Sequence, residues 1–235
     1  MNYLVTGATG GFGNHALDFL KKSISTSEIF ALVRSEAKAE ALKRAGIHVR
    51  IGDYGDKDAM ERVFEGIDRV LFVSGAPGNR QKEHANVVEA AIKAGVSYIA
   101  YTSFAEADKA TSPLAEDHLF TERLIEKAGI SHTFLRNNWY LENELPLVEA
   151  AMNSGKFVYA AGNGKTGWAM KREYAEVAAK ALLGADYPAI LELSGKPVNY
   201  NTLANALKKA TGKEFEVISS DDSGFINHLV ANGMP

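Results

Sequence analysis

The N-terminal segment reads Tyr3-Leu4-Val5-Thr6-Gly7-Ala8-Thr9-Gly10-Gly11-Phe12-Gly13, an apolar strand sequence that runs into a glycine-rich turn. Gly7 suits a sharp exit from the strand, Gly10 leaves room for a pyrophosphate, and Gly13 lets a following helix pack closely. The helix expected over residues 11–22 would direct free N–H groups at the phosphates. We therefore predict a dinucleotide-binding turn, with Thr9, Gly11 and Phe12 as further contacts. The alternative is a plain glycine-rich turn.

The composition of the 235-residue chain is that of a globular protein, with 46% hydrophobic and 23% charged residues. Twenty-six basic and 29 acidic side chains give a net charge of −3 without a dense basic run, so we expect no nucleic-acid partner. The chain lacks Cys, which excludes a disulfide framework and a Cys-ligated metal, and we expect no metal site. No apolar run reaches the ~18 residues that span a bilayer. We therefore predict a cytoplasmic protein without membrane contact.

Apolar runs alternate with amphipathic stretches along the first two thirds of the chain. We expect strands at residues 28–33, 48–51, 69–73, 98–101 and 133–135, and helices at 35–45, 56–65, 80–94 and 115–128. Such repeated units predict an α/β fold with a doubly wound parallel sheet of the Rossmann type, over residues 1–155. A smaller, interleaved α/β substrate lobe is expected over residues 156–235, with elements at 157–159, 174–183, 190–193, 202–210 and 215–218.

The end of the second strand predicts which nicotinamide cofactor binds, because it lies beside the adenosine ribose. The sequence there is Ala31-Leu32-Val33-Arg34-Ser35. An acidic residue would accept hydrogen bonds from a free 2′-OH, whereas the Arg34 guanidinium offers a charged fork to a 2′-phosphate. We therefore predict NADP, used as NADPH, with Lys38 as a second charge. The alternative for Arg34 is a solvated surface side chain.

Three further strand ends carry candidate contacts. Asp53 either hydrogen-bonds near the adenine or starts a turn. The loop Val73-Ser74-Gly75-Ala76-Pro77-Gly78 lets the backbone approach the nicotinamide half, with Ser74 and Gly75 as contacts, or is merely flexible. The stretch Asn137-Asn138-Trp139-Tyr140 offers amides beside a stacking surface for a flat acceptor, or packs the base of a helix running to Asn153.

The spacing Gly7-x-x-Gly10-x-x-Gly13 resembles the turn of the short-chain dehydrogenase/reductase superfamily. Typical members carry a Tyr-x-x-x-Lys pair, in which Lys lowers the Tyr pKa for proton exchange with substrate. No Tyr of this chain is followed by Lys four residues later. The corresponding helix has His118 and Glu122 one turn apart, which predicts an acid or, more often, a local contact. Ser103 donates to substrate or nicotinamide, or caps the next turn.

The chain resembles an atypical short-chain dehydrogenase of the NmrA-like group, and within it the type 2 NAD(P)H quinone oxidoreductases and triphenylmethane reductases. The matching stretches are Gly7 to Gly13, Ala31-Leu32-Val33-Arg34, Tyr101-Thr102-Ser103, Thr111-Ser112-Pro113-Leu114, Leu135-Arg136-Asn137-Asn138-Trp139-Tyr140 with Glu142-Asn143, and Ala160-Ala161-Gly162-Asn163-Gly164-Lys165.

This resemblance implies cofactor contacts from Asn137, Asn138, Tyr140 and Asn143. It also implies an acceptor pocket, to which we assign Ser103, Phe104, Asn137, Trp139 and Tyr140. The group tends to have a basic residue before an acidic-Tyr helix start. Here Lys171 and Arg172 both precede Glu173-Tyr174 and both are candidates, and we place Lys171 at the cofactor. Related proteins usually continue beyond Gly233-Met234-Pro235, so we expect a chain shortened at its C-terminal end.

We predict an NADPH-dependent oxidoreductase that transfers hydride to a small-molecule electron acceptor, either quinone-like or otherwise electron-poor and conjugated. No catalytic residue is assigned, and a homo-oligomer is compatible with the sequence. The alternative is an NmrA-like regulator that senses NADP without turnover. A nucleotide-sugar epimerase is disfavoured, because that chemistry ordinarily needs the absent Tyr-Lys pair.

Overall fold

The computed structural model describes residues 1–184 and 186–234, and the chain divides into two compact units. The first unit comprises Met1–Asn137 and Lys171–Leu193, and the second comprises Asn138–Met170 and the chain from Ser194 onward. These bounds differ from the predicted division at residue 155. Residues 138–154 group with the second unit, and residues 171–193 return to the first.

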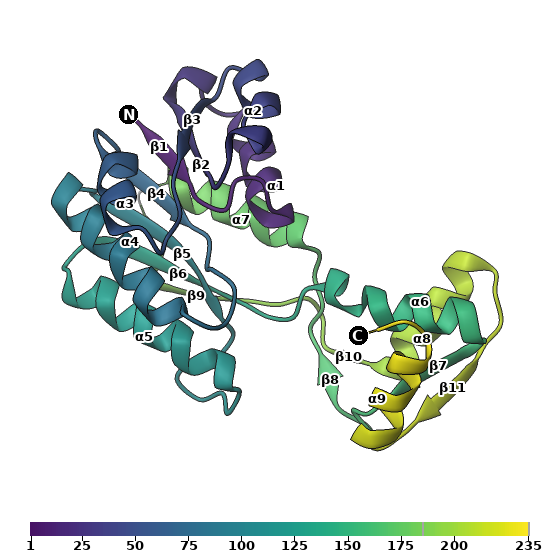
Figure 1. The fold of residues 1–235 in the computed structure, drawn as a ribbon. Coiled ribbons are helices and arrows are strands. Elements are labelled where there is room, and N and C mark those ends of the chain that lie inside the picture. Colours follow the sequence, from purple (N-terminus) through teal and green to yellow (C-terminus); the bar gives the residue numbers. More distant parts are fainter. Residues whose placement is uncertain (185, 235) are drawn as a thin grey trace. The chain divides into compact units, whose positions relative to one another are not determined.

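A parallel sheet of seven strands forms the centre of the first unit within the described residues, in the order β3-β2-β1-β4-β5-β6-β9 (Figure 1). The strands are β1 (Tyr3–Val5), β2 (Ile29–Val33), β3 (His48–Ile51), β4 (Arg69–Phe72), β5 (Tyr98–Phe104), β6 (Ser131–Asn137) and β9 (Ile190–Leu193). The strand order reverses between β1 and β4, and such a switch point leaves a crevice outside the carboxyl ends of the strands. The predicted α/β fold with a doubly wound parallel sheet is confirmed.

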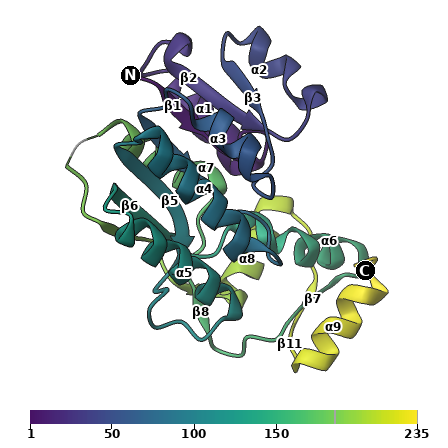
Figure 2. The same cartoon turned by 60° about the vertical axis from the view of Figure 1, so that its left-hand side comes forward.

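Helices cover both faces of this sheet (Figure 1). One layer consists of α3 (Lys57–Phe64), α4 (Arg80–Ala94) and α5 (Pro113–Lys127), which lie side by side in Figure 2. Their apolar side chains share one core with sheet residues such as Phe72, Tyr101 and Phe134. The other layer contains α1 (Gly11–Leu20) and α7 (Lys171–Leu183), which pack against each other. The segment between β2 and β3 forms η2 (Glu36–Lys38) and α2 (Glu40–Arg44), where we predicted one helix.

Two elements predicted for the C-terminal lobe belong to the first unit. Helix α7 packs on α1 and on the sheet, and strand β9 pairs in parallel with β6, with Leu191 opposite Leu135. Our assignment of residues 174–183 and 190–193 to the lobe is therefore corrected. The apolar spacing of a segment predicts its own conformation, but it does not identify a partner strand far away in the sequence.

The second unit is smaller and has its own core. Strand β7 (Lys156–Tyr159) pairs in parallel with β11 (Glu216–Ser219), and β8 (Lys165–Thr166) pairs antiparallel with β10 (Val198–Asn199). The helical segments are η3 (Leu141–Glu144), α6 (Leu145–Ser154), α8 (Tyr200–Thr211) and α9 (Asp222–Ala231). Phe157 and Phe215 stack in the core, and the buried Glu144 accepts hydrogen bonds from Trp168 Nε1 at 2.9 Å and the Tyr200 hydroxyl at 3.0 Å.

None of the helices in residues 1–184 and 186–234 combines the length and the apolar character that crossing a bilayer requires.

Candidate functional site

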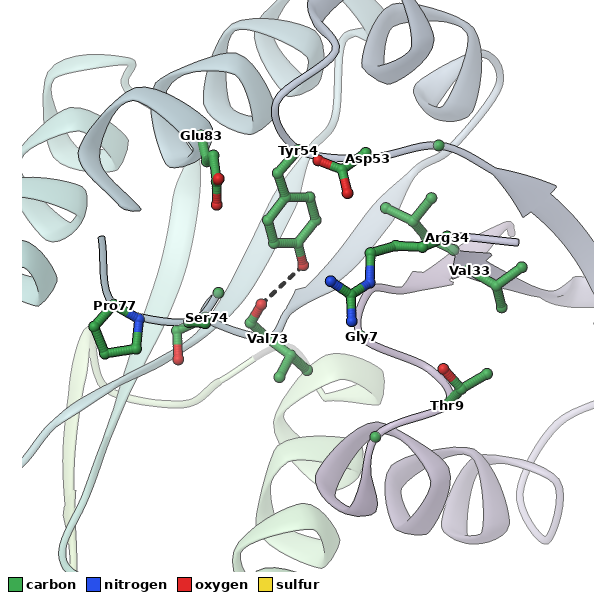
Figure 3. Close-up of a pocket in the computed structure, with 15 residues that line it drawn as sticks. Gly7, Thr9, Val33, Arg34, Asp53, Tyr54, Val73, Ser74, Pro77 and Glu83 are labelled. Carbon is green, nitrogen blue, oxygen red and sulfur yellow. Dashed lines mark hydrogen bonds between the residues drawn. The ribbon is translucent and has the colours of Figure 1, made fainter. Parts of the chain in front are cut away.

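A cavity of about 370 Å³ opens in the first unit at the carboxyl ends of β1 to β4 (Figure 3). Its position is where open α/β sheets bind ligands, beside the point at which the strand order reverses. Residues that follow four adjacent strands line it: Gly7, Thr9, Gly10, Arg34, Gly52, Asp53, Tyr54, Val73, Ser74, Gly75, Ala76 and Pro77, together with Leu32, Val33 and Glu83. Six residues that we predicted as cofactor contacts therefore meet here.

The turn after β1 presents backbone to this cavity. Gly7 has a φ of 58°, and its carbonyl oxygen accepts a hydrogen bond from the Gly10 N–H at 3.0 Å. Gly10 is the N-cap of α1, and no side chain caps the helix there among the described residues. A Cβ on Gly10 would meet only the Gly7 oxygen, at 3.3 Å, whereas a Cβ on Gly13 would lie 2.3 Å from that oxygen. Gly10 thus leaves space for a ligand at a helix N-terminus, and Gly13 permits close packing.

Arg34 follows β2, and its exposed side chain extends into the cavity (Figure 3). Its guanidinium has no carboxylate partner in the part of the chain that the structure describes. A charged fork of this kind, near a helix N-terminus, suits a phosphate. Lys38, our second predicted charge, is not among the residues that line the cavity.

Asp53 and Tyr54 form the rim that follows β3. Asp53 Oδ1 accepts a hydrogen bond from the Gly55 N–H at 2.9 Å, which is the turn geometry that we predicted as one of its two roles. The Tyr54 hydroxyl donates to the Val73 carbonyl at 2.8 Å and also contacts Thr6 Oγ1 (Figure 3). Burial raises the Tyr54 pKa well above its ordinary value, so the phenol keeps its proton. Its hydrogen bond to Val73 links the segments that follow β3 and β4. Sequence reasoning missed Tyr54, whose only signal was its place at a strand end.

Side chains from α4 and β5 hold the loop that follows β4. The Ser74 N–H donates to Thr102 Oγ1 at 2.8 Å, and the Gly75 N–H donates to His84 Nε2 at 2.9 Å. The Gly75 carbonyl accepts from Arg80 Nε at 3.0 Å. Thr102, His84 and Arg80 are all buried, so their hydrogen bonds hold this segment from the side of the core. The predicted alternative of a flexible loop does not describe it.

His118 and Glu122 bind different partners, and no hydrogen bond joins the two side chains in the described structure. His118 Nδ1 accepts from the Tyr101 hydroxyl at 2.9 Å, and the ring also hydrogen-bonds the Thr102 backbone. Burial, with a smaller effect of Arg80, lowers the His118 pKa to about 4. The imidazole is therefore uncharged at neutral pH and engaged inside the core.

Ser103 belongs to a buried ionic cluster that sequence reasoning missed. Its hydroxyl donates to Glu122 Oε1 at 2.5 Å, and the same carboxylate receives Arg136 Nε at 3.0 Å and Nη2 at 2.7 Å. Arg136 also pairs with Asp108 and, at 3.1 Å, with Glu192. The Glu122 hydrogen bonds raise the Arg136 pKa. In this structure the Ser103 hydroxyl thus donates to Glu122, which lies on a helix that local spacing does not connect to it.

The two basic candidates at the start of α7 lie at opposite ends of α1. A Cβ on Gly11 would meet Lys171 Cδ at 3.6 Å, so the Lys171 side chain passes over the glycine turn. The Arg172 guanidinium instead lies over the Phe19 ring, 5.7 Å from its centre. Lys171 is therefore the candidate that the fold places at the turn.

The remaining predicted residues divide between the two units. Asn137 ends β6, and Phe104 is half-buried with its ring 6.0 Å from that of His118. Phe12 is a buried residue of α1. Asn138, Trp139, Tyr140 and Asn143 belong to the second unit, where Trp139 is 41% exposed. Within the described ranges, no three His, Cys, Asp or Glu side chains gather as metal ligands.

Comparison with known proteins adds a family and close relatives. A family model described as NAD(P)H-binding matches residues 7–182. Quinone oxidoreductase 2 of Escherichia coli (strain K12) is 39% identical over 98% of this chain and 82% of that protein. The crystal structure of an E. coli NADPH-dependent quinone oxidoreductase complexed with NADPH has a TM-score of 0.93 at 38% identity, over 99% of this chain and 83% of the other. The crystal structure of the Citrobacter sp. triphenylmethane reductase complexed with NADP(H) has a TM-score of 0.95 at 34% identity. The match covers 100% of this chain and 85% of the other.

Proposed function

Because the chain belongs to the NAD(P)H-binding family, we propose that it is an NADPH-dependent reductase of quinone-like or other electron-poor conjugated acceptors. The observation that carries this proposal is the Arg34 guanidinium, which enters the cavity without a carboxylate partner in the described residues. It stands beside a glycine turn whose backbone is open to a ligand. This charge arrangement favours a cofactor with a 2′-phosphate.

The residues of the cavity fit NADPH. Gly7, Thr9, Gly10 and the N-terminus of α1 would hold the pyrophosphate, because a side chain at Gly10 would occupy the space that the phosphate needs. Arg34 would bind the 2′-phosphate, and Lys171 would bring a positive charge to the turn from above Gly11. When bound, this cofactor supplies a hydride from its nicotinamide ring.

The choice of acceptor follows from the lack of a Tyr-x-x-x-Lys pair in the sequence and from the groups that line the cofactor cavity. Its titratable lining residues in the described structure are Arg34, Asp53, Tyr54 and Glu83. Tyr54, the phenol among them, has a raised pKa, which disfavours its use as an acid. A simple ketone needs a proton or strong electrostatic support as hydride arrives. A quinone delocalises the incoming charge and can take its proton from water, so it needs less help from the protein.

Turnover separates this proposal from the predicted NADP sensor, which would have the same cofactor site. We expect NADPH oxidation to be fast with quinones and cationic triarylmethane dyes and slow with simple ketones and aldehydes. The measurement is NADPH absorbance with a panel of acceptors. Binding of NADPH without oxidation by any of them would favour the sensor, and equal rates with ketones and quinones would contradict the acceptor class.

Replacing Arg34 by Ala should abolish the preference for NADPH over NADH. A charge-assisted contact with the 2′-phosphate is worth roughly 1.5–3 kcal/mol, which corresponds to about tenfold or more in affinity. Titration of both cofactors into the wild type and the variant gives the ratio. Lys38→Ala is the matched control, since it removes a nearby exposed cation that does not line the cavity. Equal affinities in the wild type would contradict the assignment.

Replacing Trp139 by Ala should lower kcat/KM for quinones by about tenfold while leaving the Kd for NADPH unchanged, because we assign its exposed indole to the acceptor. Ile226→Ala, which shortens another exposed apolar side chain of the second unit, is the control. Steady-state kinetics and cofactor titration measure the two quantities. An equal loss of NADPH affinity would assign Trp139 to the cofactor instead.

A further inference from the structure

Both backbone groups of Gly75 are used inside the protein. Its N–H donates to His84 Nε2 at 2.9 Å, and its carbonyl accepts from Arg80 Nε at 3.0 Å. Gly75 nevertheless lines the cavity, between Ser74 and Ala76. A ligand therefore meets Gly75 through its Cα, and the hydrogen bonds of this residue go to His84 and Arg80 instead.

The position of the His84 proton follows from its partners. The Gly75 N–H can only donate, so Nε2 must carry the acceptor lone pair and the proton must sit on Nδ1. Nδ1 lies 2.8 Å from Thr121 Oγ1, which accepts that proton. His84 is fully buried, and burial, followed by the charge of Arg80, lowers its pKa to about 3. The ring is uncharged at neutral pH, as acceptance at Nε2 requires.

Thr121 therefore supplies the close acceptor that holds the His84 ring in the orientation on which the loop depends. It lies on α5, is fully buried, and is not among the residues that line the cavity. Without its oxygen, the Nδ1 proton of His84 would lose its acceptor at 2.8 Å, which is costly inside the core. The Tyr101 hydroxyl lies 3.5 Å from Nδ1 and donates its own proton to His118, so it can only accept from Nδ1, and at that distance the hydrogen bond is weak. The ring would have to turn towards Tyr101 to strengthen that bond, and this would misalign Nε2 from the Gly75 N–H.

We infer that His84 and Arg80 are positioning residues that fix the cavity wall formed by residues 74–77 through the Gly75 peptide groups, with Thr121 setting the orientation of the His84 hydrogen bonds. This assignment rests on the proposed function in one respect only, namely that NADPH is the ligand that reports on the wall. The tether itself does not depend on the ligand.

Thr121→Val and Thr121→Ser test this inference without touching the cavity. In Thr121→Val we expect the Gly75 amide to exchange with solvent at least about tenfold faster, and the Kd for NADPH to rise about three- to tenfold, the worth of one hydrogen bond. Thr121→Ser keeps the hydroxyl and should restore both values. Amide exchange followed by NMR and cofactor titration are the measurements.

Thr133→Val is the matched control. Thr133 is equally buried, and its hydroxyl binds the Tyr98 hydroxyl and the Pro188 carbonyl, so its loss removes a comparable buried group outside the cavity lining. It should change neither Gly75 exchange nor NADPH affinity. If Thr121→Val behaves like Thr133→Val, or Thr121→Ser like Thr121→Val, the inference is wrong. If the wild type does not bind NADPH, the proposed function fails. The exchange rate of the Gly75 amide still shows whether Thr121 supports the hydrogen bond between Gly75 and His84.

Discussion

Gly10→Val should raise the Kd for NADPH by about a hundredfold or more, because it would displace a phosphate from one or two charge-assisted contacts. Gly10 has φ −77° and ψ 162°, an extended conformation that a β-branched residue adopts readily. Its Cβ would meet one protein atom within 4 Å, the Gly7 oxygen at 3.3 Å. The valine methyls would therefore project into the space that we assign to the pyrophosphate, with little effect on the protein core.

Gly13→Ala is the contrasting variant three residues along the same turn. Its Cβ would lie 2.3 Å from the Gly7 oxygen and 2.8 Å from the Gly7 carbonyl carbon, so backbone must move. We expect Gly13→Ala to lower the melting temperature by several degrees, and Gly10→Val to leave it near the wild-type value. Cofactor titration and thermal unfolding of both proteins make the comparison. Normal NADPH binding by Gly10→Val would mean that the turn is only structural.

Lowering the pH from 7 to 5 should reduce the free energy of unfolding by about 4 kcal/mol through two buried histidines. Burial holds the pKa of His84 at about 3 and that of His118 at about 4 in the folded state. The unfolded chain takes up these protons near pH 6.5. The unfolded state thus binds more protons below that pH, and stability falls as the pH drops through 6.5 towards 4 and then 3. Each histidine contributes roughly 2 kcal/mol by pH 5, at 1.36 kcal/mol per pH unit.

Urea unfolding at pH 7 and pH 5 measures this loss. His118→Gln removes one of the two groups, so the difference between the two pH values should fall by about half, whatever the variant's stability at pH 7. A wild-type difference below about 1 kcal/mol would show that these imidazoles are protonated or solvated in the folded protein.

The sequence predicted the parts of the site that are local along the chain. The turn from Gly7 to Gly13 was predictable because strand, glycines and helix follow one another directly, and Arg34 because a strand end has a known place in this fold. The partners of Ser103 and His118 could not be predicted in this way, since Glu122 and Tyr101 come from other elements. His84 carried no signal at all, because a buried polar residue on an amphipathic helix looks like any other until its neighbours are placed.

The same limit explains the division of the chain. Lys171–Leu193 resembles the start of a C-terminal lobe by its position, yet α7 covers α1 and β9 extends the sheet beside β6. The pairing of β6 with β9, with Leu135 opposite Leu191, is a contact between segments far apart in the sequence, which local periodicity does not encode.

Helix α7 and strand β9 belong to the first unit but are synthesised after residues 138–170 of the second unit, which affects when the first unit can complete its fold. A nascent chain that has emerged only to residue 170 holds α1 without its partner helix and β6 with an open edge. Such an edge is a template for pairing with other chains, and long-range parallel pairing is slow to form. The unit that carries the glycine turn therefore closes only once residue 193 has left the ribosome, after the segment 138–170 of the other unit is already outside.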